Sequence, residues 1–276
     1  MSHRYKTNWS SLLLRMDSQY VGVDWSSGAW VAIVYSEGET TPTVDVFEEI
    51  REVWDEYGKS AQRIVVDVPI GLCESVESES CPCVEADGEI SRRCDDLART
   101  VIGSRSSAVF TAPAREAARL ASEGAEYADV SAKNNSLTGK GLTQQAASIS
   151  NGIVEVEDLL LSDGDSDILV EGHPEVCFRA FNGALEHSKH TAAGVEERLS
   201  ALKSVTEYEG GDWRTIAGEL HGSVYKVGID DVLDAFALAL TACAPHDEFQ
   251  RLPSDPPEDT RGLPMQMVYR SETQLR

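Results

Sequence analysis

Acidic residues stand at the ends of several elements that the sequence predicts. Asp24, Asp67 and Glu171 each end an apolar run, and Asp231 and Asp234 open an apolar stretch near the end of the chain. Residues three apart share one face of a helix, so the last two can point the same way. Several carboxylates at strand ends would repel one another unless cations lay between them. Mg²⁺ and Mn²⁺ prefer such oxygen ligands, and pairs of these ions about 3.5–4 Å apart serve phosphodiester hydrolysis.

The acids therefore predict metal-assisted phosphoryl chemistry, with all five as catalytic candidates and the four aspartates as metal ligands. A plainer interpretation stands beside it, because a chain with 47 Asp and Glu residues places some at element ends by chance. Asp230 fits an N-cap, with Asp231 favouring the helix dipole. Chance placement explains Asp24 and Asp67 less well, since each interrupts or ends an apolar run where an unpaired charge is costly.

His173 lies between two acids, Glu171 and Glu175. In that position it is a candidate catalytic residue, as a metal ligand or a general base. The alternative is a structural role, because Pro174 follows it and proline is typical of the first turn of a helix.

The elements that must position these residues follow from the apolar pattern. Two short apolar runs around an Asp-Trp-Ser-Ser-Gly turn predict a hairpin. A third strand, a helix and a β-branched strand buried on both faces follow, then a long stretch without a strand, and later one more strand. The expected strands are 20–24, 29–35, 43–47, 62–68 and 167–171. The expected helices are 48–57, one opening near Glu89, 113–122, 143–161, one through Phe181 from His173, 194–204, 212–221 and 230–243, with loops at 73–88 and 131–141.

The charge balance is strongly acidic. Lys and Arg number 24 against 47 Asp and Glu, for a formal net charge of −23, and the acids are spread through every segment. This pattern resembles that of cytoplasmic proteins from salt-accumulating halophilic archaea, where salt screens a dense carboxylate surface. It argues against broad electrostatic binding to nucleic acid or to an anionic membrane. No apolar run approaches eighteen residues, so we predict a soluble cytoplasmic protein without a membrane partner.

Local groups of basic residues are the candidates for phosphate binding. Residues 92–119 include six arginines and only three acids. This local excess of positive charge suits the binding of phosphate oxygens. The alternative is salt bridging to neighbouring acids. Lys140, in a Gly-Lys-Gly segment without Walker spacing, either reaches the site or marks a plain turn. Lys189 and Arg198 either add cations at the site or belong to a solvated helix. The substrate-binding candidates are Arg92, Arg93, Arg99, Lys140, Lys189 and Arg198.

Six cysteines in a chain of 276 residues do not resemble a secreted disulfide framework, and a reduced compartment fits better. Cys81, Cys83 and Cys94, with Cys73 nearby, provide enough thiols for zinc but lack the usual paired C-x-x-C spacing.

Eight motifs in order resemble domain-of-unknown-function family 429: GVDWSSGAW, VVDVPIGL, RRCDDLAR, SSAVFTAPAR, GKGLTQQ, EGHPEVCF, SKHTAAGVEERL and DDVLDAFALALTA. The resemblance implies a predicted nuclease with an RNase H-like mixed sheet in βββαβαβα order and a large helical insertion at about 72–166. It implies that Asp24 is the ligand on the first strand and Asp67 or Glu171 the second acid. Asp231 and Asp234 would be the pair on the last helix.

We therefore expect one RNase H-like α/β domain over 20–246. Residues 1–19 would be a disordered leader or an incorrectly assigned start, and 247–276 a proline-rich tail. The predicted function is that of a metal-dependent nuclease or phosphodiesterase using Mg²⁺ or Mn²⁺, with nucleic acid as the candidate substrate. An actin-like or sugar-kinase-like ATP phosphotransferase shares the βββαβ core, but 151–243 lack the duplicated half it needs. A non-catalytic binding module of the same fold is the third interpretation.

Overall fold

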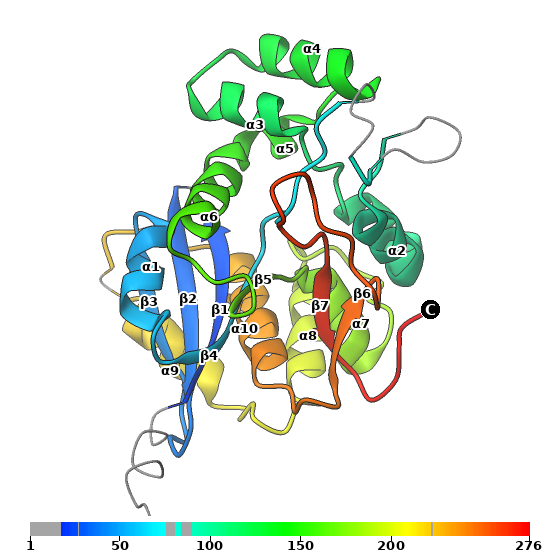
Figure 1. Cartoon of the computed structure of the whole chain (residues 1–276). Coiled ribbons are helices and arrows are strands. Elements are labelled where there is room, and N and C mark those ends of the chain that lie inside the picture. The colour runs from blue at the N-terminus through cyan, green and yellow to red at the C-terminus, as the bar shows by residue number, and fades with distance from the viewer. Residues whose placement is uncertain (1–17, 27, 76–80, 84–89, 222) are drawn as a thin grey trace, which may run out of the picture.

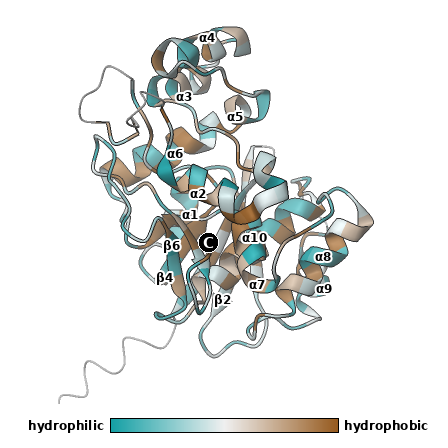
Figure 2. Cartoon of the chain, turned by 90° about the vertical axis from the view of Figure 1, so that its right-hand side faces the viewer, coloured by the Kyte–Doolittle hydropathy of each residue, from teal (hydrophilic) through white to brown (hydrophobic). Residues whose placement is uncertain are grey.

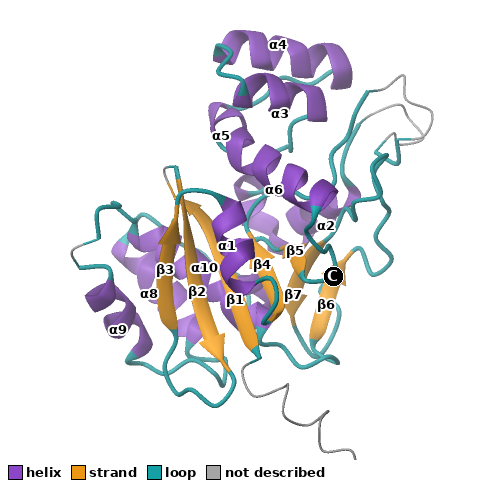
Figure 3. Cartoon of the chain, turned by 60° about the vertical axis from the view of Figure 1, so that its left-hand side comes forward, coloured by secondary structure: helices purple, strands orange, loops and turns teal. Residues whose placement is uncertain are grey.

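A mixed five-stranded sheet forms the centre of the protein (Figure 3). The computed structural model describes residues 18–26, 28–75, 81–83, 90–221 and 223–276. The strand order is β3-β2-β1-β4-β5. β1, β2 and β3 are antiparallel, whereas β4 runs parallel to β1 and β5 parallel to β4. The five predicted strands are confirmed, with the bounds β1 (Gln19–Ser26), β2 (Ala29–Ser36), β3 (Thr43–Phe47), β4 (Ala61–Val66) and β5 (Leu169–Glu171).

Helices cover both faces of the sheet and build two apolar cores (Figure 1). On one face, α1 (Ile50–Tyr57) and α6 (Ser150–Ser162) pack on side chains such as Val21 and Val23. On the other, α7 (Pro174–Asn182), α8 (Ala192–Leu202), α9 (Asp212–Glu219) and α10 (Ile229–Ala242) enclose a second core. β4 contributes side chains to both apolar cores, since Ile64, Val65 and Val66 are fully buried. The mixed colours of α6 and α8 in Figure 2 show that these helices carry both apolar and polar residues.

The predicted helical insertion lies between β4 and β5 and contains α2 (Arg93–Ile102), α3 (Arg115–Ser122), α4 (Tyr127–Thr138), α5 (Gln144–Ser148) and α6. α3, α4 and α5 stand beyond the carboxyl ends of β1 and β4 (Figure 1). The helix expected over 143–161 is two helices that meet at Ile149. The expected helix start near Glu89 and most of the loop 73–88 lie outside the described residues.

The polar loop predicted at 131–141 is wrong, because most of that stretch is α4. The helix has little apolar pattern, and Val130, which packs with Ala117 and Leu142, is joined by polar tertiary contacts. The fully buried Asn134 side chain accepts a hydrogen bond from the Ala114 backbone at 2.8 Å and donates one to the Lys140 carbonyl at 2.7 Å.

The proline-rich tail predicted for 247–276 contains two strands. β6 (Phe249–Leu252) and β7 (Met267–Arg270) form an antiparallel pair, and Val268 bridges to Gly172 just after β5. Prolines between these strands belong to a loop held by Asp259, which is buried and accepts a hydrogen bond from the Leu72 backbone at 3.0 Å. The segment is thus part of the folded core.

At the amino end, β1 begins at Gln19. The expected leader or incorrectly assigned start at 1–19 concerns residues 1–17, which lie outside the described chain. No helix in the described part combines the length and apolar character that a membrane span requires.

Candidate carboxylate site

Backbone packing brings the start of α10 to the end of β1. A Cβ on Gly22 would lie 2.0 Å from the Ala239 nitrogen and 2.3 Å from the Ala235 carbonyl oxygen, so only glycine permits this approach. Asp24 shares the α10 face of β1 because alternate strand residues point the same way. Two strand residues span about 6.6 Å and four helical residues about 6 Å, so Asp231, one turn before Ala235, lies level with Asp24.

The parallel pairing of β1 and β4 brings Asp67 beside Asp24. Val23 is in register with Val66, and the Asp67 backbone donates a hydrogen bond to the Val23 carbonyl at 3.0 Å. The Asp24 carboxyl group is buried, and the neighbouring Asp67 raises its pKa. Repulsion between two close carboxylates is reduced when one of them carries a proton.

The acids of α10 complete the cluster. Asp231 accepts hydrogen bonds from the Ser26 hydroxyl at the end of β1 and from the Gly228 backbone at 3.1 Å. Asp234 is buried and lies 2.8 Å from the Lys189 ammonium, which is 3.4 Å from Asp230. We call Asp24, Asp67, Asp231 and Asp234 the carboxylate cluster. Lys189, from the loop before α8, is a predicted basic residue that does reach it.

Burial and mutual repulsion disfavour the charged state of these acids. Burial raises the pKa of Asp24 well above its ordinary value, and Asp67, Asp234 and Asp231 raise it further. Burial also raises the pKa of Asp67, with His173 and Lys189 opposing. The pKa of Asp234 rises to about 6, chiefly through burial, although Lys189 lowers it. The cluster thus retains protons that a cation could replace.

These pKa values predict how stability depends on pH in metal-free protein. A carboxyl group with a raised pKa binds its proton more tightly in the folded chain, so stability falls as pH rises from about 4 through about 6. Between pH 4 and pH 7 the free energy of unfolding should therefore fall by on the order of 2 kcal/mol less in Asp234→Asn than in wild type. Urea unfolding of wild type and variant at high salt, from pH 4 to pH 7, measures the difference. Parallel curves for the two proteins would contradict it.

Lys189→Met tests whether the ammonium balances the cluster. The substitution leaves Asp234 buried without its cation, and we expect a loss of about 1–2 kcal/mol at pH 7, less than for a fully buried pair. Binding of Mn²⁺ should restore part of the lost stability. The control is Lys133→Met, which removes an exposed pair with Glu116 and should cost under about 0.5 kcal/mol. Equal losses in thermal or urea unfolding would show that Lys189 is an ordinary surface lysine.

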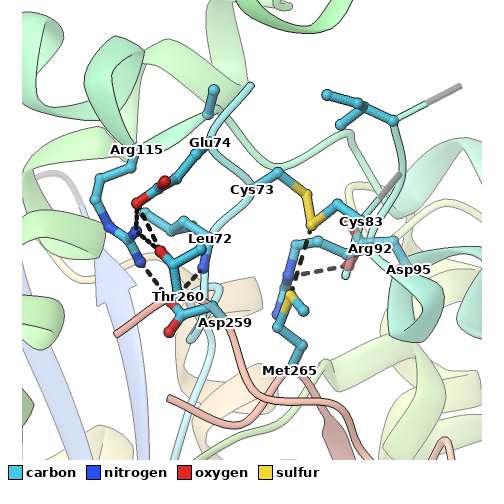
Figure 4. The surroundings of a disulfide bond; sticks show 12 residues. Leu72, Cys73, Glu74, Cys83, Arg92, Asp95, Arg115, Asp259, Thr260 and Met265 are labelled. Atoms are coloured by element: carbon cyan, nitrogen blue, oxygen red, sulfur yellow. Dashed lines mark hydrogen bonds and ion pairs between the residues drawn. A yellow bond between two sulfur atoms is a disulfide. The ribbon is translucent and has the colours of Figure 1, made fainter. Parts of the chain in front are cut away.

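Glu171, expected in the cluster, belongs to a separate ion-pair group. Arg92 is almost fully buried and donates to Glu171, to Asp95 at 2.9 Å and to the Ile70 carbonyl at 2.8 Å. The Glu171 carboxylate also accepts from the Ile70 backbone at 2.7 Å. Figure 4 shows Arg92 with Asp95. Burial raises the pKa of Glu171 to about 7, while Arg92 lowers it.

His173 lies next to Asp67 and caps α7. Its Nδ1 accepts a hydrogen bond from the Glu175 backbone at 3.2 Å, so the neutral ring carries its proton on Nε2. The role of His173 as a metal ligand or a general base stays a prediction. A cavity of about 20 Å³ between His173, Asp67 and Glu171 has roughly the room of one water molecule.

The other basic candidates lie in different surroundings. Arg99 pairs with Asp96 at 2.7 Å, and Lys140 donates to the Ile90 carbonyl at 3.1 Å. Arg198 is fully buried and pairs with Glu175. Arg93 is exposed, and the described structure gives its guanidinium no ion pair.

Three polar residues near the site were missed from the sequence. Ser26 holds Asp231, Asp95 shares Arg92 with Glu171, and Glu175 pairs with both Arg198 and Arg105. The Ser-Ser turn after Asp24 was the available signal for Ser26. The i,i+3 spacing from Arg92 was the available signal for Asp95, whereas Glu175 carried none, because 23 residues separate it from Arg198 and 70 from Arg105.

Two groups of described residues have potential ligand atoms that all lie within 4.8 Å of one another. They are Cys73, Cys81 and Cys83, and Cys94, Asp95 and Glu171. Arg92 already neutralises the second group. The carboxylate cluster is not among these groups in the described structure. Its four carboxylates nonetheless form a hard oxygen donor set of the kind that Mg²⁺ or Mn²⁺ takes.

The fold and the site define an α/β protein with aspartates gathered where a buried helix meets the ends of two parallel strands. The model of a family described as a protein of unknown function (DUF429) matches residues 22–258, which include the second half of β1 and all of β4 and α10. The chain therefore belongs to the DUF429 family. Comparisons with curated proteins and with solved structures give no match.

Proposed function

We propose that this protein is a metal-dependent phosphodiesterase or nuclease. The observation that carries the proposal is the assembly of Asp24, Asp67, Asp231 and Asp234 at one edge of the sheet. They come from positions up to 210 residues apart in the chain. Simple solubility does not explain acids brought together in this way, because surface carboxylates are better separated than gathered.

The arrangement of the elements supports an RNase H-like fold. The antiparallel β1–β3 meander, the parallel strands β4 and β5, and the acids on β1, after β4 and on the last long helix agree with the pattern that the family resemblance implies. In this proposal the insertion α2–α6 stands over the site and shapes access to it.

Asp24 and Asp67, with Asp231 or Asp234, would hold the cation. When bound, such an ion supplies an activated water and stabilises charge on the leaving oxygen. Ser26 fixes the Asp231 carboxylate, and Lys189 lies beside Asp234, where it can balance charge or meet a phosphate oxygen. The Nε2 proton of His173 can hold a water or a phosphate oxygen near Asp67.

The net charge of −23 bears on the substrate. A polyanion is repelled by this surface at low salt, whereas a small diester is repelled less. Screening lengths fall from about 10 Å at 0.1 M to about 3 Å at 1 M salt. A nuclease with this surface should therefore gain kcat/KM toward nucleic acid as salt rises, more than toward a small diester.

The test is hydrolysis of single-stranded, duplex and branched nucleic acids and of bis(p-nitrophenyl) phosphate, with Mn²⁺ and with EDTA, across this salt range. We expect Mn²⁺-dependent product from at least one substrate and none with EDTA. Absence of hydrolysis of every substrate by Mn²⁺-loaded protein, or equal hydrolysis in EDTA, would overturn the proposal.

A further inference from the structure

Three buried cysteines gather in the segment between β4 and α2. Cys73 and Cys83 form a disulfide, and Cys81 is a free thiol whose sulfur lies within 4.8 Å of both. The three residues are at most 6 % exposed. Met265 adds a fourth sulfur, with its Sδ 3.7 Å from Cys83 Sγ (Figure 4). We call Cys73, Cys81 and Cys83 the thiol cluster.

We propose that the thiol cluster, once reduced, is a binding site for a thiophilic cation of the Zn²⁺ class, so that the disulfide and the bound cation are alternative states. Three sulfurs around a tetrahedral Zn²⁺, with Zn–S bonds of about 2.3 Å, lie roughly 3.8 Å apart. Side chains already within 4.8 Å need little movement to reach that spacing. Thiolate and thioether sulfurs are soft ligands that select such ions over Mg²⁺ or Mn²⁺.

The chemistry of the switch balances. A dithiol reductant gives two electrons and two protons, its own sulfurs join as a disulfide, and the Cys73–Cys83 bond breaks to two thiols. Binding of Zn²⁺ then releases the thiol protons of Cys73, Cys81 and Cys83 as three Zn–S bonds form. Without the cation, exchange with a small disulfide oxidant, which takes up two electrons and two protons and leaves as two thiols, restores the Cys73–Cys83 bond and leaves Cys81 as the free thiol.

Backbone hydrogen bonds show which segments the disulfide, or the bound cation, would connect. The Arg115 backbone donates to the Cys73 carbonyl at 2.9 Å, which ties this segment to α3. The Ser91 backbone donates to the Cys83 carbonyl at 2.9 Å, directly before Arg92. A bond between Cys73 and Cys83, through sulfur or through a cation, therefore joins the segment after β4 to the start of α2.

Cys94 is not part of this set, although the sequence grouped it with Cys81 and Cys83. Its Sγ lies 3.5 Å from Asp95 Oδ1, within the Arg92 ion-pair group. Burial raises the pKa of its thiol well above the ordinary value.

The experiment titrates Co²⁺ into full-length protein reduced with a phosphine under nitrogen, with free thiols counted beforehand. Co²⁺ bound by thiolates gives intense near-ultraviolet charge-transfer bands that carboxylate-bound Co²⁺ lacks, so the carboxylate cluster does not interfere. Zn²⁺ should then displace the Co²⁺. We expect saturation at one equivalent for reduced wild type and for the controls Cys243→Ser, Cys94→Ser and Asp24→Asn.

We expect no such band for oxidised wild type or for reduced Cys81→Ser. Cys81→Ser keeps the disulfide pair, so its oxidised form should unfold at the wild-type temperature. The proposal fails if reduced wild type with all thiols free shows no band. It also fails if Cys81→Ser gives the wild-type titration or if Cys94→Ser loses it.

Discussion

Replacement of Asp24 by asparagine should lower kcat/KM for Mn²⁺-dependent phosphodiester hydrolysis by roughly 10³, because a cation at the site contributes several kcal/mol to the transition state. Asp24 is the centre of the carboxylate cluster, since Asp67, Asp234 and Asp231 all raise the pKa of its buried carboxyl group. Asparagine keeps the shape but removes a charge that a divalent ion needs. Initial rates over a range of substrate concentrations measure the effect.

Stability separates this catalytic effect from damage to the fold. Asp24→Asn relieves repulsion among buried acids, so at pH 7 without metal the variant should be at least as stable as wild type. The matched control is Asp167→Asn, an exposed acid just before β5 that should keep wild-type activity. Full activity in Asp24→Asn, or the same loss in Asp167→Asn, would contradict the role given to Asp24.

Arg92→Ala should cost about 3–5 kcal/mol of unfolding free energy, because it leaves Glu171 and Asp95 buried without their cation. The guanidinium is 2 % exposed and contacts both carboxylates and the Ile70 carbonyl. Urea unfolding at pH 7 measures the loss. A phosphate-binding arginine on the surface would instead cost little stability and mainly weaken substrate binding.

The neighbouring Arg93 is a close control for Arg92. It is exposed, so Arg93→Ala should change stability by less than about 0.5 kcal/mol. The double variant Arg92→Met, Glu171→Met removes both charges and should be less destabilised than Arg92→Ala. If Arg92→Ala and Arg93→Ala unfold alike, the buried ion-pair group does not stabilise the fold as described.

The parts of the fold that were predicted correctly carry their signal locally. β2 is mostly apolar, β4 ends in the buried run Ile64–Val66, and α10 is mostly apolar after Asp234, so burial was visible in the residue types. α4 was missed because what buries Asn134 is a contact with Ala114, 20 residues away. The C-terminal segment was missed because Asp259 is held by Arg115, 144 residues earlier, and prolines alone indicate a loop.

The candidate site shows the same limit. Acids that end apolar runs were visible, and Asp67, Asp231 and Asp234 lie near enough to Asp24 to raise its pKa, while their role as a metal site stays a prediction. The sequence could not show which charges are already paired inside the protein. Arg92 and Arg198 were predicted to bind phosphate, yet each is buried against a glutamate. Glu171 was placed in the cluster by its position at a strand end, but Arg92 holds it elsewhere.

The most direct test of the central claim is calorimetric titration of Mn²⁺ into metal-free protein at pH 7, for wild type and Asp24→Asn. Mn²⁺ is a hard ion and disfavours the thiol cluster, so the heat reports on the carboxylates. We predict saturable binding of one or two ions per wild-type chain and its loss in Asp24→Asn. Absence of saturable binding to wild type, or the same isotherm for Asp24→Asn, would show that the carboxylate cluster is not a metal site.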